Sequence, residues 1–276
     1  MMKSKNLQYA FYVEYYEKLP EILKKQKEFK EKPKKQNNSK KEKNSEAVDY
    51  RQMNQEILNI ARETSSSMQK LSEYKEELSV LEFTSSYPGI LVGTGYNHKV
   101  KGKGEIGMGF TFDYVTGLPY LPGSSLKGIL RFGFRQEEYI HEVVKDVLHT
   151  ELSDGEINEL TNTIFEGADS RKKFVFYDAT ISHNEKGKSL LALDTITPHT
   201  KDGLKEPNPI TFLRICPDIK IHFEFQLYEV ILSTGKQVSK DNIKEIFKNI
   251  LEDLGIGAKT NVGYGVLESV ENKEDM

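Results

Sequence analysis

Hydrophobic and polar residues alternate along residues 219–227 with the two-residue period of a strand that buries one face. After this strand, apolar residues recur every three or four positions behind Ser239, which can cap a helix whose stop signal is Gly255. Residues 266–270 return to a strand pattern. The C-terminal part of the chain is therefore predicted to run strand, helix, strand.

Helical periodicity dominates the middle of the chain. One helix is predicted to begin at Ser124 or Ser125, since either hydroxyl can accept a hydrogen bond from a free amide of the first turn. A second helix is marked by the apolar stripe of residues 140–148. A third begins where Ser153 and Glu156 have the spacing of a capping box.

Several further segments have the composition of strands and turns. Glycines and β-branched residues predict a strand at residues 89–95 that ends in a glycine-rich loop, and residues 106–115 read as extended. Two strands, at residues 173–182 and 189–194, are predicted to pair across a turn. Residues 195–209, with three prolines and little apolar content, are expected to form a long protruding loop.

The order of these elements predicts a fold class. From residue 89 onward it is strand, helix, inserted helices, a strand pair, a loop, strand, helix and strand. Without the insertion this is the β-α-β-β-α-β order of ferredoxin-like folds, which RNA-recognition domains share. We therefore expect an α+β protein with a ferredoxin-like (RRM-like) core and helical insertions.

The N-terminal region has a different composition from the rest of the chain. Residues 7–23 mix aromatic and charged residues, as in a short docking helix, and residues 46–82 have helical periodicity. Between them, residues 24–43 hold ten lysines against three acidic residues. This segment fits either a solvated linker or a basic arm that touches RNA. We expect a helical extension over residues 1–80, with this lysine-rich segment inside it, and a second domain over residues 81–276.

Composition narrows the possible functions. The 276 residues carry 39 basic and 42 acidic side chains, so any nucleic-acid binding must rest on a local basic face. The single Cys216 excludes an internal disulfide and a cysteine-rich zinc site, and favours a reducing cytoplasm. Neither a signal-peptide core nor an apolar run of roughly 20 residues is present, so we expect no membrane partner. The histidines lack metal-ligand spacing, and we expect neither a metal nor another cofactor.

Two glycine-containing segments are the candidates for ligand binding. At the first, Pro122 and Gly123 precede a helix on which Lys127 and Arg131 are four residues apart. The free amides of a helix start, its serines and these cations suit a phosphate, although these residues alone favour an ordinary capped surface helix with a basic face. The second, residues 255–265, precedes a strand and is therefore neither a P-loop nor a dinucleotide fingerprint. Its four glycines are expected to let a ligand approach the backbone closely.

Four motifs together resemble the RAMP superfamily of CRISPR proteins. They are the stretch from Leu118 to Arg131, the glycine-rich stretch from Gly255 to Gly265, the I-F-E-G element from Ile164 to Gly167, and the D-x-x-T-P-H segment that ends at His199. The last is similar to one branch of that superfamily, the sixth subunits of type III-B Cmr effector complexes. The usual form of the third motif is I-F-G, and in this chain Glu166 is inserted before the glycine. The resemblance covers roughly residues 87 to 270 and leaves the lysine-rich segment out.

The resemblance implies an α+β RAMP core of ferredoxin-like type and a non-catalytic, cytoplasmic RNA-binding role in a CRISPR ribonucleoprotein for antiviral defence. Such a subunit contacts the 3′ part of the CRISPR RNA and its target RNA duplex. It caps a filament of backbone RAMP subunits, and the other Cmr subunits, including the small subunit, are its partners. RNA binding is then expected on one cationic surface, formed by the two glycine-containing segments together with a lysine-containing loop. The residues expected to bind RNA are Gly123, Ser124, Ser125, Lys127, Arg131, Lys99, Lys101, Gly257, Ala258, Lys259, Thr260, Asn261, Gly263 and Tyr264.

The alternative that the resemblance leaves open is an RNA-cleaving enzyme. Some relatives cut target RNA with an aspartate before the P-G-S-S-L-K-G motif, and Asp113 lies ten residues before Gly123. Others process precursor RNA with a histidine, for which His98 is the candidate. We expect no catalytic residue in this chain, and cleavage assays on the two alanine variants distinguish the alternatives.

Overall fold

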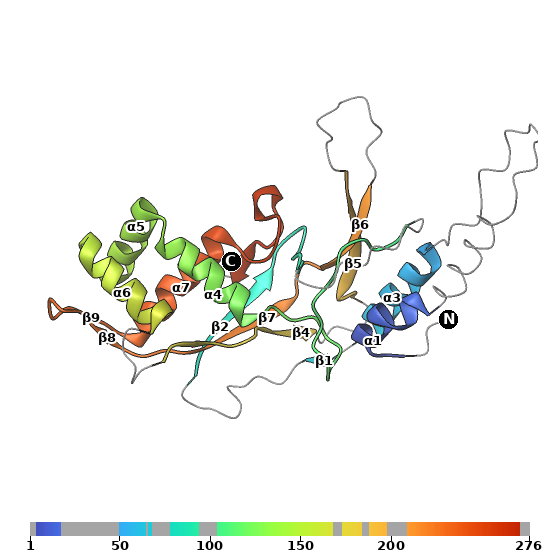
Figure 1. Ribbon diagram of the computed structural model, residues 1–276, viewed down its shortest axis with the longest axis horizontal. Coiled ribbons are helices and arrows are strands. Elements are labelled where there is room, and N and C mark those ends of the chain that lie inside the picture. The colour runs from blue at the N-terminus through green and yellow to red at the C-terminus, as the bar shows by residue number, and fades with distance from the viewer. Residues whose placement is uncertain are drawn as a thin grey trace, which may run out of the picture. The chain divides into compact units, whose positions relative to one another are not determined.

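The structure is a computed structural model that describes residues 4–17, 50–64, 66–67, 78–93, 104–167, 173–183, 188–197 and 209–270 (Figure 1). The chain divides into two compact units. The first comprises Met1–Thr64, Thr94–Leu118 and Lys186–Leu213, and the second comprises Ser65–Gly93, Pro119–Glu185 and Arg214–Met276. Each unit combines three separate stretches of the chain, and the predicted division into residues 1–80 and 81–276 stays a prediction.

An antiparallel sheet forms the base of the second unit. Its strand order is β1-β4-β7-β2-β10, and a short strand, β3, also pairs with β7. The central pair is held in register by apolar partners, with Leu81 opposite Phe223 and Phe83 opposite Ile221. The strands are β1 (Ser66–Ser67), β2 (Ser79–Ser85), β3 (Val175–Phe176), β4 (Thr180–His183), β7 (Lys220–Gln226) and β10 (Leu267–Ser269).

Helices pack on one face of this sheet (Figure 1). They are α4 (Gly123–Phe134), α5 (Glu137–Leu148), α6 (Asp154–Glu166) and α7 (Lys240–Leu254). The ring of Phe247 on α7 lies 5.4 Å from that of Phe225 on β7, which joins the helical layer to the sheet. All four helices were predicted. The capping box predicted at Ser153 is present, and Ser239, predicted as a cap, also forms one. No helix in the described part of the chain is long and apolar enough to cross a membrane.

Two predictions at the start of the second unit were wrong. Residues 79–82, assigned to a helix over 46–82, belong to β2, and the described helix in that stretch is α3 (Arg51–Glu63). Of the predicted strand at residues 89–95, the described residues 89–93 form only a single bridge, between Ile90 and Ile215. The first error arises because β2 forms by pairing with the buried β7, a contact between distant segments that leaves no local signal in the sequence.

The central strand β7 is buried on both faces, whereas its alternating pattern predicted one solvent face. His222 is 3% exposed and Glu224 is 1% exposed. Nε2 of His222 lies 2.9 Å from the Ser182 hydroxyl on β4, and its Nδ1 lies 2.9 Å from Oε1 of Glu82 on β2, at ion-pair distance but without the alignment of a good hydrogen bond. We interpret this as a cross-strand polar network, because so little imidazole surface is open to a substrate.

The first unit contains α1 (Leu7–Tyr12), a short 3-10 helix η1 (Glu14–Tyr16), α3, and a hairpin of β5 (Leu191–Ile196) and β6 (Ile210–Ile215). The ring of Tyr15 stacks on Tyr50 at 4.9 Å, and its hydroxyl donates a 2.6 Å hydrogen bond to Asn54. Burial raises the pKa of Tyr15. The predicted pairing of residues 173–182 with 189–194 was wrong, since β4 pairs with β7 and β5 with β6.

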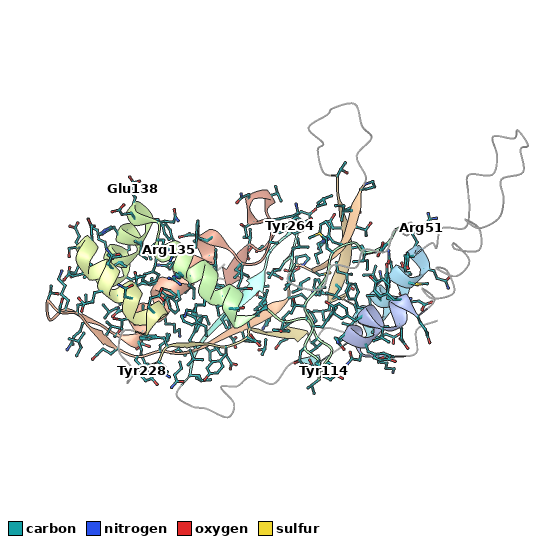
Figure 2. All side chains as sticks on the ribbon, in the orientation of Figure 1. Arg51, Tyr114, Arg135, Glu138, Tyr228 and Tyr264 are labelled. Carbon is teal, nitrogen blue, oxygen red and sulfur yellow. The ribbon has the colours of Figure 1, made fainter. Side chains whose placement is uncertain are left out.

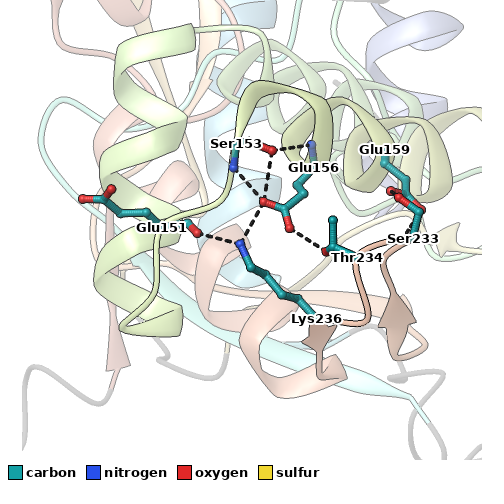
Figure 3. A network of polar contacts seen from close by, with 7 residues as sticks. All are labelled: Glu151, Ser153, Glu156, Glu159, Ser233, Thr234 and Lys236. Carbon is teal, nitrogen blue, oxygen red and sulfur yellow. Dashed lines mark hydrogen bonds and ion pairs between the residues drawn. The ribbon is translucent and has the colours of Figure 1, made fainter.

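A polar network fastens the hairpin of β8 (Val230–Ile231) and β9 (Gln237–Val238) to α6 (Figure 3). The carboxylate of Glu156 accepts hydrogen bonds from Thr234 at 2.6 Å and Lys236 at 2.9 Å, as well as from the amide of Ser153 at 2.8 Å. These donors lower the pKa of Glu156 to about 2, the Thr234 hydroxyl having the largest effect. Glu156 therefore both completes the capping box at the start of α6 and binds the turn between β8 and β9.

Candidate nucleic-acid interface

The start of α4 is held by a carboxylate from another part of the sheet. Oδ1 of Asp178 accepts a 2.7 Å hydrogen bond from the amide of Gly123, the first residue of the helix. Pro122 occupies the N-cap position, and neither Ser124 nor Ser125 caps the helix as predicted. A side chain at Gly123 would place its Cβ 2.3 Å from the carbonyl oxygen of Phe176, so only glycine allows this approach. The helix start is therefore built against the connection between β3 and β4.

This arrangement changes what the helix start offers a phosphate. One of its free amides is already satisfied, and the Asp178 carboxylate brings negative charge to the place where the helix dipole favours an anion. The amide of Ser125 donates to the Pro122 carbonyl at 2.9 Å. Ser124 is exposed and Ser125 is half-buried. A phosphate at this helix start would have to bind beside the carboxylate of Asp178.

The two predicted cations of α4 also have partners within the unit. Nζ of Lys127 lies 5.9 Å from the ring centroid of Phe176, a cation–π distance. The guanidinium of Arg131 forms an ion pair with Glu166 at the end of α6, at a site where both side chains are partly exposed. Arg131 also lines a cavity of about 290 Å³ between α4, α5 and α6. Both cations thus turn toward β3 and α6, and each remains partly accessible.

The glycine loop, residues 255–265, packs on residues 88–93, which follow β2. The amide of Ala258 donates to the carbonyl of Leu91 at 2.8 Å, and that of Gly265 donates to Gly89 at 2.9 Å. The loop also closes on itself, since the amide of Ile256 donates to the carbonyl of Gly265 at 2.9 Å. Backbone hydrogen bonds therefore hold both ends of the loop in place.

This packing revises the role of the glycines. A Cβ at Gly265, whose φ is +79°, would lie 2.0 Å from the carbonyl oxygen of Ile256. The sequence argument expected glycine to let a ligand approach the backbone, but here the approaching group is the protein's own backbone. The close contact therefore serves the internal fold of the loop.

The tip of the glycine loop is the part that faces solvent. Lys259, in the left-handed region with a φ of 61°, leads into a 3-10 turn, η3 (Thr260–Val262). Gly257, Lys259 and Asn261 are exposed, whereas Gly263 is half-buried. Tyr264, for which stacking and packing were both considered, is only 8% exposed and packs (Figure 2). Among the polar side chains of this loop that were predicted to bind RNA, those at least partly open to solvent are therefore the ammonium of Lys259, the hydroxyl of Thr260 and the amide of Asn261.

The sequence model of the RAMP superfamily matches residues 82–268. The chain belongs to the RAMP superfamily. This RAMP protein is 28% identical over 164 residues to the CRISPR system CMR subunit Cmr6 of Saccharolobus solfataricus. That match covers 58% of this chain and 48% of the relative, so the chain spans about half the length of the relative it matches. The predicted resemblance to this branch of the superfamily is confirmed.

A solved structure shows the same fold. A chain in the cryo-EM structure of the type III-B Cmr-beta bound to cognate target RNA aligns over 96% of this RAMP protein and 90% of its own length. The TM-score is 0.57 and the sequence identity is 21%. The crystal structure of Cmr6 from Pyrococcus furiosus aligns over 70% of this chain, with a TM-score of 0.43 and 20% identity.

The predicted RNA-binding residues of this RAMP protein fall into separate groups. The contacts described above hold the α4 start on the β3–β4 connection and the glycine loop on residues 88–93, and they join the members of each segment without joining the two segments. A single cationic surface that includes both segments stays a prediction. Lys99, Lys101 and the alternative catalytic candidate His98 lie outside the described residues.

Asp113, the other catalytic candidate, lies in a turn of the first unit. Its Oδ1 accepts 2.7 Å hydrogen bonds from both the amide and the hydroxyl of Thr116. Burial raises the pKa of Asp113, but the hydrogen bonds from Thr116 and from the backbone of Val115 together outweigh this effect, so the net pKa is lowered. This arrangement is that of an aspartate stabilising its own turn.

Sequence reasoning missed Tyr87, which adjoins the glycine loop and is 81% exposed. The amide of the preceding residue, Ser86, donates to the carbonyl of Val266 at 3.0 Å. The only sequence signal was an aromatic residue directly before Pro88, which does not distinguish a buried ring from an exposed one.

Proposed function

We propose that this RAMP protein is a non-catalytic RNA-binding subunit of a type III-B CRISPR ribonucleoprotein effector. Its family membership and its similarity to Cmr6 support a place among Cmr subunits. The fold shared with a chain of a target-RNA-bound Cmr complex is consistent with that place. In this role the protein contacts the 3′ part of the CRISPR RNA and target RNA duplex and caps the backbone filament in antiviral defence.

The sheet topology supports a ferredoxin-like core for this role. Along the chain, β2 leads to α4, β4 and β7 follow, and α7 leads to β10, with α5 and α6 as the helical insertion. The spatial order β4-β7-β2-β10 then places the last strand beside the first and the two middle strands together, as a split β-α-β arrangement requires. The helices α1 and α3 of the first unit correspond to the proposed N-terminal extension.

The observation that carries the RNA-binding proposal is the exposed tip of the glycine loop. Its backbone is held from both sides, and it presents Lys259, Thr260 and Asn261. A lysine, a hydroxyl and an amide bind phosphates and riboses, and they supply no general base at neutral pH. Recognition of the uniform sugar–phosphate backbone suits a subunit that must accept any guide sequence.

The test compares RNA binding by purified wild-type chain and a Lys259→Ala variant over a series of salt concentrations. If Lys259 contacts a phosphate, the variant binds all sequences more weakly, and the slope of log affinity against log salt falls by about one charge. Lys240→Ala is the matched control, since it removes an exposed lysine from the start of α7 in the same unit. Equal losses in the two variants would indicate a general charge effect and would count against this site.

A further inference from the structure

Tyr87 is an exposed aromatic ring at the end of β2. It is 81% exposed, whereas Tyr264 in the neighbouring glycine loop is buried. A single exposed ring is common on protein surfaces, so the backbone that carries Tyr87 and its surroundings decide what the ring can bind.

The backbone on both sides of Tyr87 is fixed. On one side, Ser86 donates its amide to Val266 and its hydroxyl to the carboxylate of Glu268. On the other side, the guanidinium of Arg214 donates to the carbonyl of Pro88, and the carbonyl of Gly89 accepts from Gly265. The ring is therefore carried by a backbone that loses little conformational entropy when the ring is covered.

The surroundings of Tyr87 combine apolar and cationic groups. A Cβ at Gly263 would lie 3.8 Å from the ring of Pro88, so the tip of the glycine loop adjoins the turn that carries Tyr87. Val262 on that tip is 67% exposed, and Lys259 and Asn261 are also exposed. The loop tip next to this turn therefore exposes a cation and an amide as well as an apolar side chain.

We propose that Tyr87 stacks on an unpaired RNA base while the tip of the glycine loop contacts the adjoining sugar–phosphate. The inference rests on the proposed RNA-binding function and adds the chemical class of ligand, a single-stranded nucleobase. A protein partner would favour a continuous apolar area with charges at its rim. A lone exposed ring on a turn that adjoins a lysine-bearing loop tip suits a base and its phosphate instead, because every base has a face that stacks.

The first experiment measures binding of the full-length chain to a single-stranded uridine oligonucleotide and to the same backbone without bases. Tyr87→Ala is expected to weaken binding to the base-containing RNA by roughly 5- to 150-fold, the range for loss of one stacked base. Binding to the abasic backbone and the salt slope should stay unchanged, because no phosphate contact is lost. Tyr114→Ala is the matched control, since Tyr114 is also 81% exposed but lies in the other unit.

The second experiment uses the absence of tryptophan from the sequence. Tyr87→Trp introduces a unique fluorophore, whose emission should be quenched when the base-containing RNA binds and stay constant with the abasic backbone. In Tyr114→Trp the emission should stay constant with both RNAs. Retained binding in Tyr87→Trp would also show that an aromatic face, and not the hydroxyl, is what the RNA needs.

The outcomes separate this inference from the function on which it rests. If wild-type protein binds neither RNA, the RNA-binding function fails and the stacking role fails with it. If wild-type protein binds RNA but Tyr87→Ala and Tyr114→Ala bind equally well, only the stacking role is overturned. Unchanged RNA binding by Tyr87→Ala together with lost assembly into a complex with other Cmr subunits would assign the ring to a protein partner and overturn the proposal.

Discussion

The carboxylate of Asp178 accepts a 2.7 Å hydrogen bond from the backbone amide of Gly123. This one contact joins the most recognisable motif of the chain to a residue that the sequence left unassigned. It supplies the cap that the motif's own serines were expected to provide. It also places a negative charge where a phosphate was expected, so the two roles can be separated by changing the charge alone.

The first prediction concerns Asp178. Asp178→Asn keeps an acceptor for the Gly123 amide and removes the charge, so stability should change little. If RNA phosphates reach the start of α4, this variant should bind RNA more tightly than the wild type at low salt. Asp178→Ala should lower the free energy of unfolding by about 0.5–2 kcal/mol through loss of the cap. Thermal denaturation and RNA titration measure both effects, and unchanged RNA affinity in Asp178→Asn would place RNA elsewhere.

The second prediction concerns Gly265 in the glycine loop. Gly265→Ala should destabilise the protein, with about 1–3 kcal/mol from the left-handed backbone conformation alone. The clash with the Ile256 carbonyl adds to this loss. Gly128→Ala is the control, since nothing lies within 4 Å of a Cβ there and helix propensity should raise stability by about 1 kcal/mol. Denaturant unfolding gives both values, and an unharmed Gly265→Ala variant would contradict the packing described for the loop.

The third prediction concerns the pH dependence of the Glu156 network (Figure 3). The hydrogen bonds from Thr234, the Ser153 amide and Lys236 lower the pKa of Glu156 to about 2 in the folded protein. The ordinary pKa of an unfolded glutamate is about 4.3. The stability that the carboxylate contributes is therefore fully present above that ordinary value and is lost as pH falls through the folded pKa.

The matching measurement compares the Tm of wild-type protein and Glu156→Gln between pH 7 and pH 2. The wild type should melt at a higher temperature near neutral pH, and the gap should close as the solution is acidified below about pH 4. Glu138→Gln, at an exposed position on α5, should match the wild type throughout. A gap that stays constant with pH would mean that the network owes little to the charge of Glu156.

The fourth prediction concerns catalysis at Asp113. Because both donors of Thr116 engage Oδ1, Asp113→Ala should loosen the turn without removing a catalytic group. Wild-type protein incubated with guide and target RNA, with and without divalent metal, should leave both strands intact. Asp113→Asn keeps an acceptor for the Thr116 donors but removes the charge, so it distinguishes the loss of the turn from the loss of the carboxylate. Specific cuts by the wild type that disappear in both variants would establish the enzymatic alternative.

The elements that the sequence predicted well are those specified by neighbouring residues. The capping box of Ser153 and Glu156 lies within one helical turn, and the apolar spacing of α7 repeats over its 15 residues. The strand β7 was recognised from its own alternation, although its second buried face was not. The four RAMP motifs are likewise short and continuous, and they identified the family.

The candidate site was predicted less completely because its geometry depends on residues far apart in the chain. The spacing of Lys127 and Arg131 was readable, whereas the partners Phe176 and Glu166 that hold them were not. The glycines of the loop predicted that another group comes close to its backbone, but they did not show that this group is the protein's own backbone. The choice between Tyr87 and Tyr264 as the exposed ring also depends on packing from other segments.

The sequence by itself determined α4 to α7, the caps of α6 and α7, and the superfamily, because these follow from interactions between residues a few positions apart. Only the tertiary structure decided that residues 79–85 form a strand, that Asp178 caps α4 and that the glycine loop closes on protein backbone. Each of these requires two segments separated by many residues to meet. Burial and hydrogen bonding between the two segments stabilise such a contact, and the sequence of either segment alone does not specify it.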